Sequence, residues 1–383
     1  GLIEDNLWIG VAFSNGDGGG ILKWDTTTGT LSEQINATGN QGEVKLVTMP
    51  NGDVIISYRN HIHRHIDSNG SMIAQFGYST NHPLSVDSMA TDGSIVFFGT
   101  DEGLARYVPN NQTWLPLWKS GNGLSTSTSS NNINSVFIEN NSLYVGRVGN
   151  NGQGVIDIID LSSSNSINSY SINSWPNRYG QPRSFIDCGG TVWSLIERYT
   201  WGAVYPSLIS VDSNGLGSVI DPPNSRNQYP RGMVCDDSDT LLITTTGSEG
   251  IRRYDTISKN WLNQIDNSFG IREDDISLNG IAYVDGTLFV GHDDNGAGGV
   301  SIIPINGTSV GSGSVISKGI SVTGMAPHAS TSSILLGRPG GLSGSSSVDL
   351  LNLSFFSTVS LDSYNYLASG YFTGITGNTT DVF

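Results

Sequence analysis

The sequence predicts an all-β protein built from repeated four-stranded units. A short phrase, made of Gly, Ile or Leu, any residue, Lys or Arg, and then Trp or Tyr, occurs at Gly20–Trp24, Gly103–Tyr107 and Gly250–Tyr254. Another bulky apolar residue follows each phrase at the same spacing, and these residues are Leu31, Trp114 and Trp261. Matched spacing in widely separated segments indicates copies of one supersecondary unit.

Weaker copies of the phrase fill the gaps and give a regular register along the chain. Its aromatic or apolar slot is held by Trp24, Ile66, Tyr107, Ile158, Val211, Tyr254, Ile303 and Leu351. The chain length divided by eight is about 48 residues, which suits a four-stranded unit. The fourth unit shows four short segments rich in β-branched and apolar residues, which predict strands at Ile133–Glu139, Ser142–Val148, Gly154–Leu161 and Ile167–Ile172.

Four-stranded sheets repeated around an axis form a β-propeller, which hides most strand edges. We therefore predict a single β-propeller domain over residues 1–383, with eight blades and seven as the alternative. The segment Thr379–Phe383 followed by Gly1–Gly10 resembles Asn134–Gly146. We expect the termini to close the propeller, with C-terminal residues completing the first blade. A piece cut from a longer tandem protein is the other interpretation.

Composition limits the classes of partner. The formal charge is −16 and only 18 Lys and Arg residues are present, scattered along the chain. Phosphate binding needs clustered basic residues, so the sequence argues against a nucleic-acid partner. No apolar run approaches the ~20 residues of a membrane span. An acidic surface suits cations, neutral glycans or a basic protein.

Three segments resemble the repeat of a known family. Leu7–Gly10, Phe98–Tyr107 and Leu143–Arg147 are similar to the two-component-regulator propeller repeat, whose consensus reads LWIGT, then GL, then a basic residue, Tyr and Asp. The resemblance implies a β-propeller used as an extracellular or periplasmic sensing or binding module. It supplies no catalytic residues. Ser14–Gly19 and Asp293–Gly298 are longer than the corresponding turn of that family.

These longer loops are a candidate calcium site. Asp17, Asp293 and Asp294 place carboxylates on Gly-rich backbone, the kind of ligand set that Ca²⁺ prefers. The alternative is a polar hairpin turn in which Asp caps its own backbone. Calcium is therefore one possible cofactor, and the histidine-rich segment described next suggests zinc as another.

A second candidate is the histidine-rich segment Tyr58–Asp67. If it contains the third strand of its unit, alternation places His61, His63 and His65 on one face. Two histidines spaced in this way can share Zn²⁺, with a third ligand such as His82 or an Asp from a neighbouring blade.

The same segment permits two other interpretations. His61 and His63 could act as acid and base beside Tyr58 and Arg59, removing a proton next to a uronic acid carboxylate. Some polysaccharide lyases are built on propellers with His, Tyr and Arg in the cleft, and the segment is similar to that arrangement. The structural interpretation is that these histidines pack, half-buried, between blades.

The third candidate is an aromatic insertion that lengthens the fifth repeat. Trp and Tyr side chains on a loop offer flat apolar faces that suit sugar rings, with polar tips free to hydrogen-bond. The predicted ligand-binding residues are Tyr199, Trp201 and Tyr205 of the insertion, with Arg178, Tyr179, Tyr229 and Arg231 near it.

Two features bear on the cellular compartment. Cys188 and Cys235 stand near the end of the first strand in adjacent repeats, where a disulfide and two buried free thiols are both consistent with the spacing. Sequons for N-glycosylation begin at Asn36, Asn69, Asn111, Asn140, Asn306, Asn352 and Asn378.

The sequence therefore favours an extracellular or cell-surface propeller that binds a glycan or a protein without catalysis. A lyase-like enzyme centred on the histidine-rich segment is the alternative. The single Gly-x-Ser-x-Gly match, Gly307–Gly311, lies in a Gly- and Ser-rich region with no helix after it, so it does not indicate a hydrolase.

Overall fold

The computed structural model describes most of the chain, and nearly all of its regular structure is β-strand. The described residues are 6–13, 19–25, 30–37, 44–58, 62–77, 86–149, 153–162, 167–172, 178–200, 202–212, 215–245, 250–270, 276–292, 298–316, 322, 324–328, 333–338, 347–352, 357–363 and 370–377. Within these ranges the only helices are the 3-10 turns Pro109–Asn111 and Asn267–Phe269. Neither is long or apolar enough to cross a membrane. The predicted all-β class is confirmed.

The chain divides into two compact units. Unit 1 comprises Gly1–Phe76, Gly247–Gly250 and Ile265–Phe383, and unit 2 comprises Gly77–Thr246 and Ile251–Gln264. The single domain over residues 1–383 and the number of blades stay predictions.

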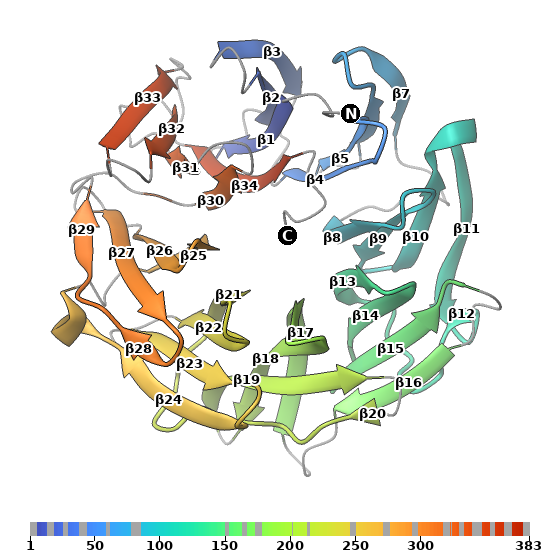
Figure 1. The fold of residues 1–383 in the computed structure, drawn as a ribbon. Helices are drawn as coiled ribbons and strands as arrows, with labels where there is room; N and C mark the ends of the chain where they lie inside the picture. The colour runs from blue at the N-terminus through green and yellow to red at the C-terminus, as the bar shows by residue number, and fades with distance from the viewer. Residues whose placement is uncertain are drawn as a thin grey trace. The chain divides into compact units, whose positions relative to one another are not determined.

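Unit 2 holds four consecutive sheets whose long strands are antiparallel (Figure 1). The first contains β8 (Val86–Thr91), β9 (Val96–Thr100), β10 (Gly103–Val108), β11 (Thr113–Ser120) and β12 (Gly123–Leu124), and the second contains β13 (Ile133–Glu139), β14 (Ser142–Val148), β15 (Gly154–Asp160) and β16 (Ile167–Ile172). The third contains β17 (Arg178–Cys188), β18 (Thr191–Thr200), β19 (Ala203–Asp212) and β20 (Gly215–Leu216), and the fourth contains β21 (Pro230–Cys235), β22 (Thr240–Thr245), β23 (Ile251–Asp255) and β24 (Asn260–Ile265). The four strands predicted for the fourth repeat are confirmed, although β15 ends at Asp160 rather than Leu161.

Unit 1 has the same construction. One sheet contains β1 (Asn6–Phe13), β2 (Gly19–Asp25), β3 (Thr30–Ala37) and β34 (Gly370–Gly377), and the next contains β4 (Val44–Thr48), β5 (Val54–Tyr58), β6 (Ile62–Ile66) and β7 (Met72–Phe76). Two further groups of strands follow. The first contains β25 (Ile276–Val284), β26 (Thr287–His292), β27 (Gly299–Asn306), β28 (Ser309–Val310) and β29 (Ser314–Ile316). The second contains β30 (Gly324–His328), β31 (Ser333–Arg338), β32 (Ser347–Asn352) and β33 (Ser357–Ser363). A single parallel pair, Asn279 with Gly324, joins these two groups.

The first sheet of unit 1 combines strands from opposite parts of the sequence. Strand β1 lies between β2 and β34, with Leu7 opposite Gly377 and Phe13 opposite Gly370. A strand from the C-terminal part of the chain thus completes the sheet of β1 to β3. The predicted completing segment, residues 379–383, lies outside the described residues.

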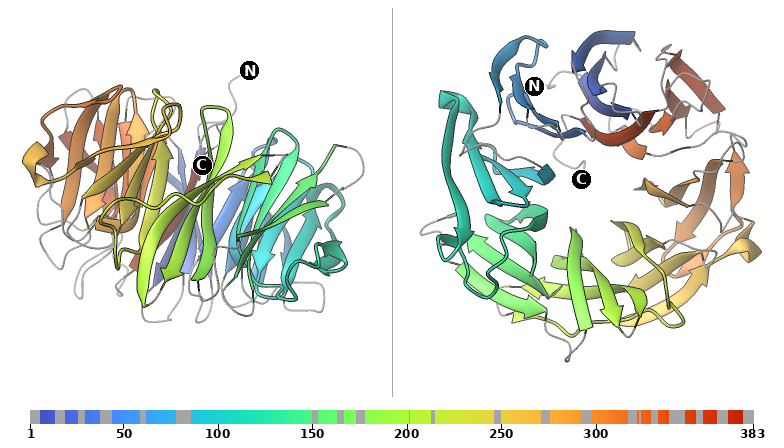
Figure 2. Two further views of the ribbon diagram at one scale, coloured as in Figure 1. Left: turned by 90° about the horizontal axis from the view of Figure 1, so that it is seen from below. Right: turned by 180° about the vertical axis from the view of Figure 1, so that it is seen from behind.

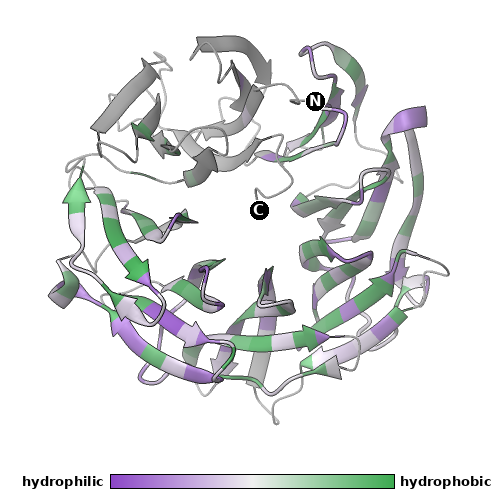
Figure 3. Ribbon diagram, viewed as in Figure 1, coloured by the Kyte–Doolittle hydropathy of each residue, from purple (hydrophilic) through white to green (hydrophobic). Residues whose placement is uncertain are grey.

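Adjacent sheets of unit 2 pack through apolar side chains. Figure 3 shows bands of hydrophobic colour along these strands. Phe137 and Ile158 of one sheet contact a cluster that includes Ile196 and Ile209 of the next. Because both faces of a sheet are covered in this way, the inner strands read as nearly continuous apolar runs.

A glycine in the second strand of several sheets marks where the next sheet comes closest. A Cβ placed on Gly99 of β9 would lie 2.7 Å from Ile133 Cγ2, and one on Gly146 of β14 would lie 2.7 Å from Pro182 Cβ. In unit 1, a Cβ on Gly291 of β26 would lie 2.9 Å from the Val322 carbonyl oxygen. Glycine therefore has a packing role at these three positions.

The substitution Gly146→Ala tests this role. The new methyl group would also meet Ser135 Oγ at 2.4 Å, so we expect overpacking to lower the free energy of unfolding by about 1–3 kcal/mol. Urea unfolding followed by circular dichroism measures the change. Gly77→Ala is the control, because no atom lies within 4 Å of its Cβ position. Equal unfolding midpoints for the two variants would contradict the packing role.

Each four-stranded sheet has two different ends. At the closed end, the chain passes from the first strand to the second and from the third to the fourth, except in the sheet of β34, β1, β2 and β3, whose first and second strands come from opposite parts of the sequence. At the crossing end, the chain passes from the second strand to the third, enters from one sheet and leaves for the next. The left view of Figure 2 shows strands of unit 2, in green and yellow, running between such ends.

Candidate functional site

The third sheet of unit 2 extends farther than its neighbours at the crossing end. Strands β17, β18 and β19 have 11, 10 and 10 residues. The second and third strands of the other sheets in this unit have five to seven. The pairs Tyr199 with Val204 and Thr200 with Ala203 continue the ladder to its tip. The insertion that was expected to be a loop is therefore largely a strand hairpin.

The segment 217–229 packs along this hairpin before the chain enters β21. Leu208 and Ile220 exchange both backbone hydrogen bonds, at 2.9 and 2.8 Å. The Gln228 N–H then donates to the Val204 carbonyl oxygen at 3.2 Å. These bonds hold Asp221 and Tyr229, which the segment carries, near the side chains of β18 and β19.

One face of the hairpin carries an ion pair. Arg198 donates through Nη2 to Asp221 Oδ2, and Ser207 Oγ donates to Asp221 Oδ1 at 2.5 Å. The Arg198 guanidinium also lies over the Tyr205 ring, 5.5 Å from its centroid. Because Arg198 forms an ion pair with Asp221 and its side chain is only 9% exposed, this face mainly fixes the segment 217–229 in place.

The other face carries a group that we call the Glu197 cluster, defined as Arg183, Glu197, Tyr199, Tyr229 and Arg231. Arg183 Nε donates to Glu197 Oε2 at 2.6 Å, and the Tyr199 hydroxyl donates to Glu197 Oε1. The Glu197 side chain is 7% exposed, whereas that of Arg183 is 41% exposed. Tyr229 is 44% exposed. The cluster thus has a buried acceptor at its centre and exposed planar groups at its edge.

The electrostatics of the cluster follow from this burial. Burial and the bond to Glu197 together raise the pKa of Tyr199 to about 12, and the nearby Tyr229 hydroxyl adds to the rise. Burial lowers the pKa of Arg231, an effect that the Glu197 charge opposes. At neutral pH the Tyr199 hydroxyl is therefore a protonated donor, already committed to Glu197.

The predicted ligand-binding residues lie in different parts of the hairpin region. The structure brings Tyr199, Tyr229 and Arg231 together in the Glu197 cluster, while Tyr205 lies on the opposite face of the hairpin. Trp201 lies outside the described residues.

Two more of these residues, Arg178 and Tyr179, begin β17. They pair with Thr200 and Tyr199 at the tip of the hairpin. Sequence reasoning missed the buried Glu197, which organises the cluster. A charged residue following the apolar run of Trp193-Ser194-Leu195-Ile196 was the available signal.

The histidine-rich segment contains strand β6, the third strand of its sheet, as expected. His63 and His65 are 1% and 2% exposed, and His65 Nε2 lies 3.0 Å from Asp53 Oδ2. Arg64 stacks on the Tyr58 ring at 5.3 Å from its centroid. Arg59, His61 and His82 lie outside the described residues. These contacts agree with a packing role for His63 and His65.

Tyr58 belongs to the core of unit 1. It is 1% exposed and packs with Trp8, Val54, Ile56 and Ile66. Burial raises the pKa of its hydroxyl, against an opposing effect of Arg64. A phenol in this position donates no proton to a bound polysaccharide unless the core opens.

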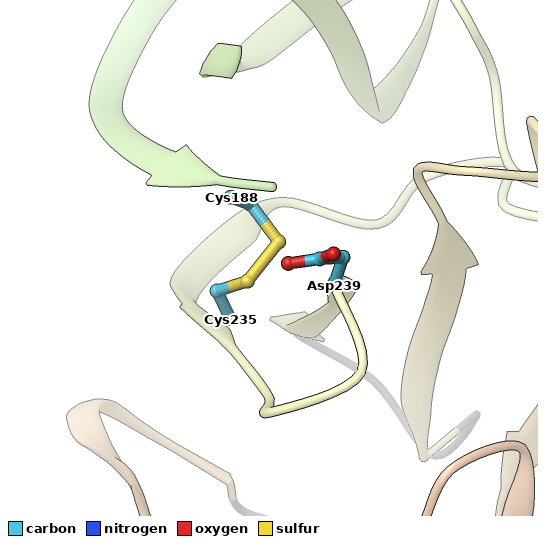
Figure 4. Close-up of side chains that lie close together, drawn as sticks. All are labelled: Cys188, Cys235 and Asp239. Atoms are coloured by element: carbon cyan, nitrogen blue, oxygen red, sulfur yellow. A yellow bond between two sulfur atoms is a disulfide. The ribbon is translucent and has the colours of Figure 1, made fainter. Parts of the chain in front are cut away.

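The described residues contain one compact group of metal-ligand side chains, Cys188, Cys235 and Asp239 (Figure 4). Their ligand atoms lie within 4.8 Å of one another. The two sulfur atoms form a disulfide, which joins the ends of β17 and β21. Since metals bind thiolates rather than disulfides, the oxidised group is a covalent link and not a metal site. Asp17, Asp293 and Asp294 lie outside the described residues.

Comparisons with known proteins place the chain by fold. No protein-family model and no curated protein sequence matches it. Among solved structures, it is similar to the dihydro-heme d1 dehydrogenase NirN in complex with DHE, with a TM-score of 0.67 and 11% identity over 97% of this chain and 75% of that one. It is also similar to the C-terminal WD40 domain of Sif2, with a TM-score of 0.56 and 10% identity over 88% of this chain and 90% of that one.

A third similar structure is Kuenenia stuttgartiensis hydrazine synthase, with a TM-score of 0.52 and 11% identity over 84% of this chain and 95% of that one. Identities this low speak for the fold alone. WD40 domains are β-propellers built from four-stranded blades. Together with the repeated sheets, these similarities show that the chain has a β-propeller fold, a scaffold suited to binding and interaction.

Proposed function

We propose that the protein is a non-enzymatic, extracellular or cell-surface binding module that recognises a glycan through the crossing end of the β17–β20 sheet. The observation that carries this proposal is the Glu197 cluster. It combines an exposed Tyr229 ring with an exposed Arg183 guanidinium that Glu197 holds in position. A protein ligand is the alternative occupant of the same surface.

The chemistry of the cluster suits a sugar better than a charged polymer. A tyrosine ring offers an apolar face to the C–H groups of a pyranose. Arg183 Nε and Nη2 contact Glu197, and the 41% exposed guanidinium has further N–H donors that a sugar hydroxyl can accept from. Because Glu197 offsets one of the two arginine charges, hydrogen bonding rather than ion pairing with a phosphate is favoured.

Two further properties support an exported module of this kind. The Cys188–Cys235 disulfide persists in oxidising compartments and is rare in reducing ones. The similarity of Leu7–Gly10, Phe98–Tyr107 and Leu143–Arg147 to the two-component-regulator repeat supports assignment of the repeats to that type, which is common in sensing modules. We include that assignment in the proposal.

The alternative activity, a polysaccharide lyase centred on His61 and His63, gains no support from the described residues. His63 and Tyr58 are both buried, and His65 pairs with Asp53. A proton-transfer residue has to reach the substrate directly or through one water molecule.

The substitution Tyr229→Ala tests the proposed function. On an array of neutral and acidic oligosaccharides, we expect the wild-type protein to bind at least one class of glycan. The variant should bind that glycan at least about tenfold more weakly, a loss of ~1.4 kcal/mol. Ile257→Ala is the matched control, because Ile257 is an exposed apolar residue, 72% accessible, in the β23–β24 turn at the closed end of the next sheet.

Three results would contradict the proposal. The first is the absence of binding to every glycan on the array, and the second is capture of a protein ligand whose affinity Tyr229→Ala reduces. The third is release of unsaturated products from a polyuronate, lost in His63→Ala, which would establish the lyase instead.

A further inference from the structure

We propose that Asn69, Asn111, Asn140 and Asn306 carry N-linked glycans, so that the closed ends of their sheets are glycosylated while the crossing ends of these sheets are not. The proposal goes beyond the glycan-binding function, because it concerns sugars attached to this chain. It rests on where the topology places the described sequons.

Each of these four asparagines lies in or at a closed-end turn. Asn69 lies between β6 and β7, Asn111 between β10 and β11, and Asn306 at the junction of β27 and β28. These are turns between third and fourth strands. Asn140 lies between the first and second strands of its sheet, β13 and β14. No two of them share a sheet.

The acceptor side chains are accessible. All four asparagines are exposed, and so are the sequon hydroxyl residues Ser71, Thr113 and Thr308, while Ser142 is half-buried. The middle residues are Gly70, Gln112, Asn141 and Gly307, so none is the proline that blocks the sequon. The exposure of the four asparagines leaves room for an attached oligosaccharide.

The other three sequons carry no part of the proposal. Asn36 lies within strand β3, and Asn378 lies outside the described residues. Asn352 is the last residue of β32, but Leu353 and Ser354, the rest of its sequon, lie outside the described residues. The four described turn sequons are enough to define the pattern.

The contrast between the two ends is clearest in unit 2. Its first and second sheets carry sequons in closed-end turns, at Asn111 and Asn140. At the closed ends of its third and fourth sheets the Cys188–Cys235 disulfide joins β17 to β21. The Glu197 cluster, by contrast, involves the crossing-end part of β18 and the approach to β21. Glycans at the proposed positions would therefore leave Tyr229 exposed.

The chemical step balances with one co-reactant, a lipid-pyrophosphate-linked oligosaccharide. The asparagine Nδ2 forms a bond to the anomeric carbon of the first sugar, and the bond from that carbon to the pyrophosphate oxygen breaks. One amide proton is released, and the lipid pyrophosphate leaves. The product keeps a neutral side chain, which adds solubility to a chain in which only 14% of residues are charged.

The test is mass spectrometry of peptides from the intact protein, purified from the cells that naturally produce it. Fragmentation that preserves the sugar should place hexose-containing mass on Asn69, Asn111, Asn140 and Asn306. Expressed in the same cells, Thr113→Ala should lose the modification at Asn111, whereas Thr113→Ser should retain it. Unmodified asparagine at these four positions, or modification that survives Thr113→Ala, would overturn the proposal.

A second measurement tests the bare crossing end without using the unidentified ligand. Nitration of Tyr229 by tetranitromethane should proceed at the same rate in protein with and without its glycans. Arg226→Thr creates a sequon at the exposed Asn224, in segment 217–229, and a glycan there should slow nitration at least threefold. Slower nitration in the naturally glycosylated protein would overturn the proposed separation of ends. Because occupancy and nitration do not depend on ligand binding, failure of the proposed function leaves both results intact.

Discussion

Asp157→Ala is expected to lower the free energy of unfolding of unit 2 by about 3–5 kcal/mol, because it leaves a buried arginine without its counter-charge. Asp157 Oδ2 lies 2.9 Å from Arg147 Nε, and neither side chain has any exposed surface. An uncompensated charge at such a depth costs more than the lost packing of the carboxylate. The measurement is urea unfolding at constant ionic strength.

The effect should be concentrated in the segment that connects β12 to β13. Arg147 Nη2 donates to the Ser125 carbonyl oxygen at 2.9 Å and Nη1 donates to that of Ser130 at 3.2 Å. Ser125 Oγ in turn donates to Asp157 Oδ1 at 2.7 Å. Hydrogen exchange of the amides in residues 125–132 should therefore accelerate in Asp157→Ala more than exchange in the paired strands.

Two variants isolate the charge as the cause. Asp160→Ala removes another carboxylate of β15, which accepts a hydrogen bond from the backbone N–H of the exposed Ser162. We expect this variant to lower the free energy of unfolding by less than about 1 kcal/mol. The double variant Arg147→Met/Asp157→Leu removes both charges and should recover most of the stability lost in Asp157→Ala. A double variant that is less stable than Asp157→Ala would show that packing, not the unpaired charge, determines the cost.

The strand pattern of this region could be predicted from sequence, because it depends on local composition. Asn, Gly and Ser bound the short apolar runs, and strands β13, β14 and β16 have their predicted bounds. The hydrogen bonds that link Arg147 and Asp157 to Ser125 could not be predicted, because Ser125 lies in a connection without a strand pattern. Its contact with Asp157 depends on how that connection folds back over the sheet.

The candidate site shows the same limit. The aromatic insertion was recognisable from its composition, and Tyr199 and Tyr229 do belong to one cluster. The role of Glu197 was not recognisable, since its partner Arg183 lies at a register shift in β17. Alternation along a regular strand does not say which side chain such a shift directs toward a neighbour.

Removing the disulfide is the second prediction with a large expected effect. The bond between Cys188 and Cys235 closes a loop with a sequence separation of 47 residues. For a loop of that length, the loss of chain entropy in the unfolded state corresponds to about 4 kcal/mol. Cys188→Ala/Cys235→Ala should lose stability of that order in urea unfolding, and the wild-type protein should lose a similar amount on reduction by a dithiol. The variant itself should not respond to the dithiol.

The same variant links the covalent structure to the proposed binding surface. The disulfide joins the ends of β17 and β21, and the Glu197 cluster draws Arg183 from β17 and Arg231 from the start of β21. If the bond fixes the spacing of these strands, its loss should weaken glycan binding as well as stability at temperatures where the variant is fully folded. A variant that is destabilised but binds with wild-type affinity would show that apolar packing, through residues such as Trp193 and Leu241, holds the two sheets in register without the bond.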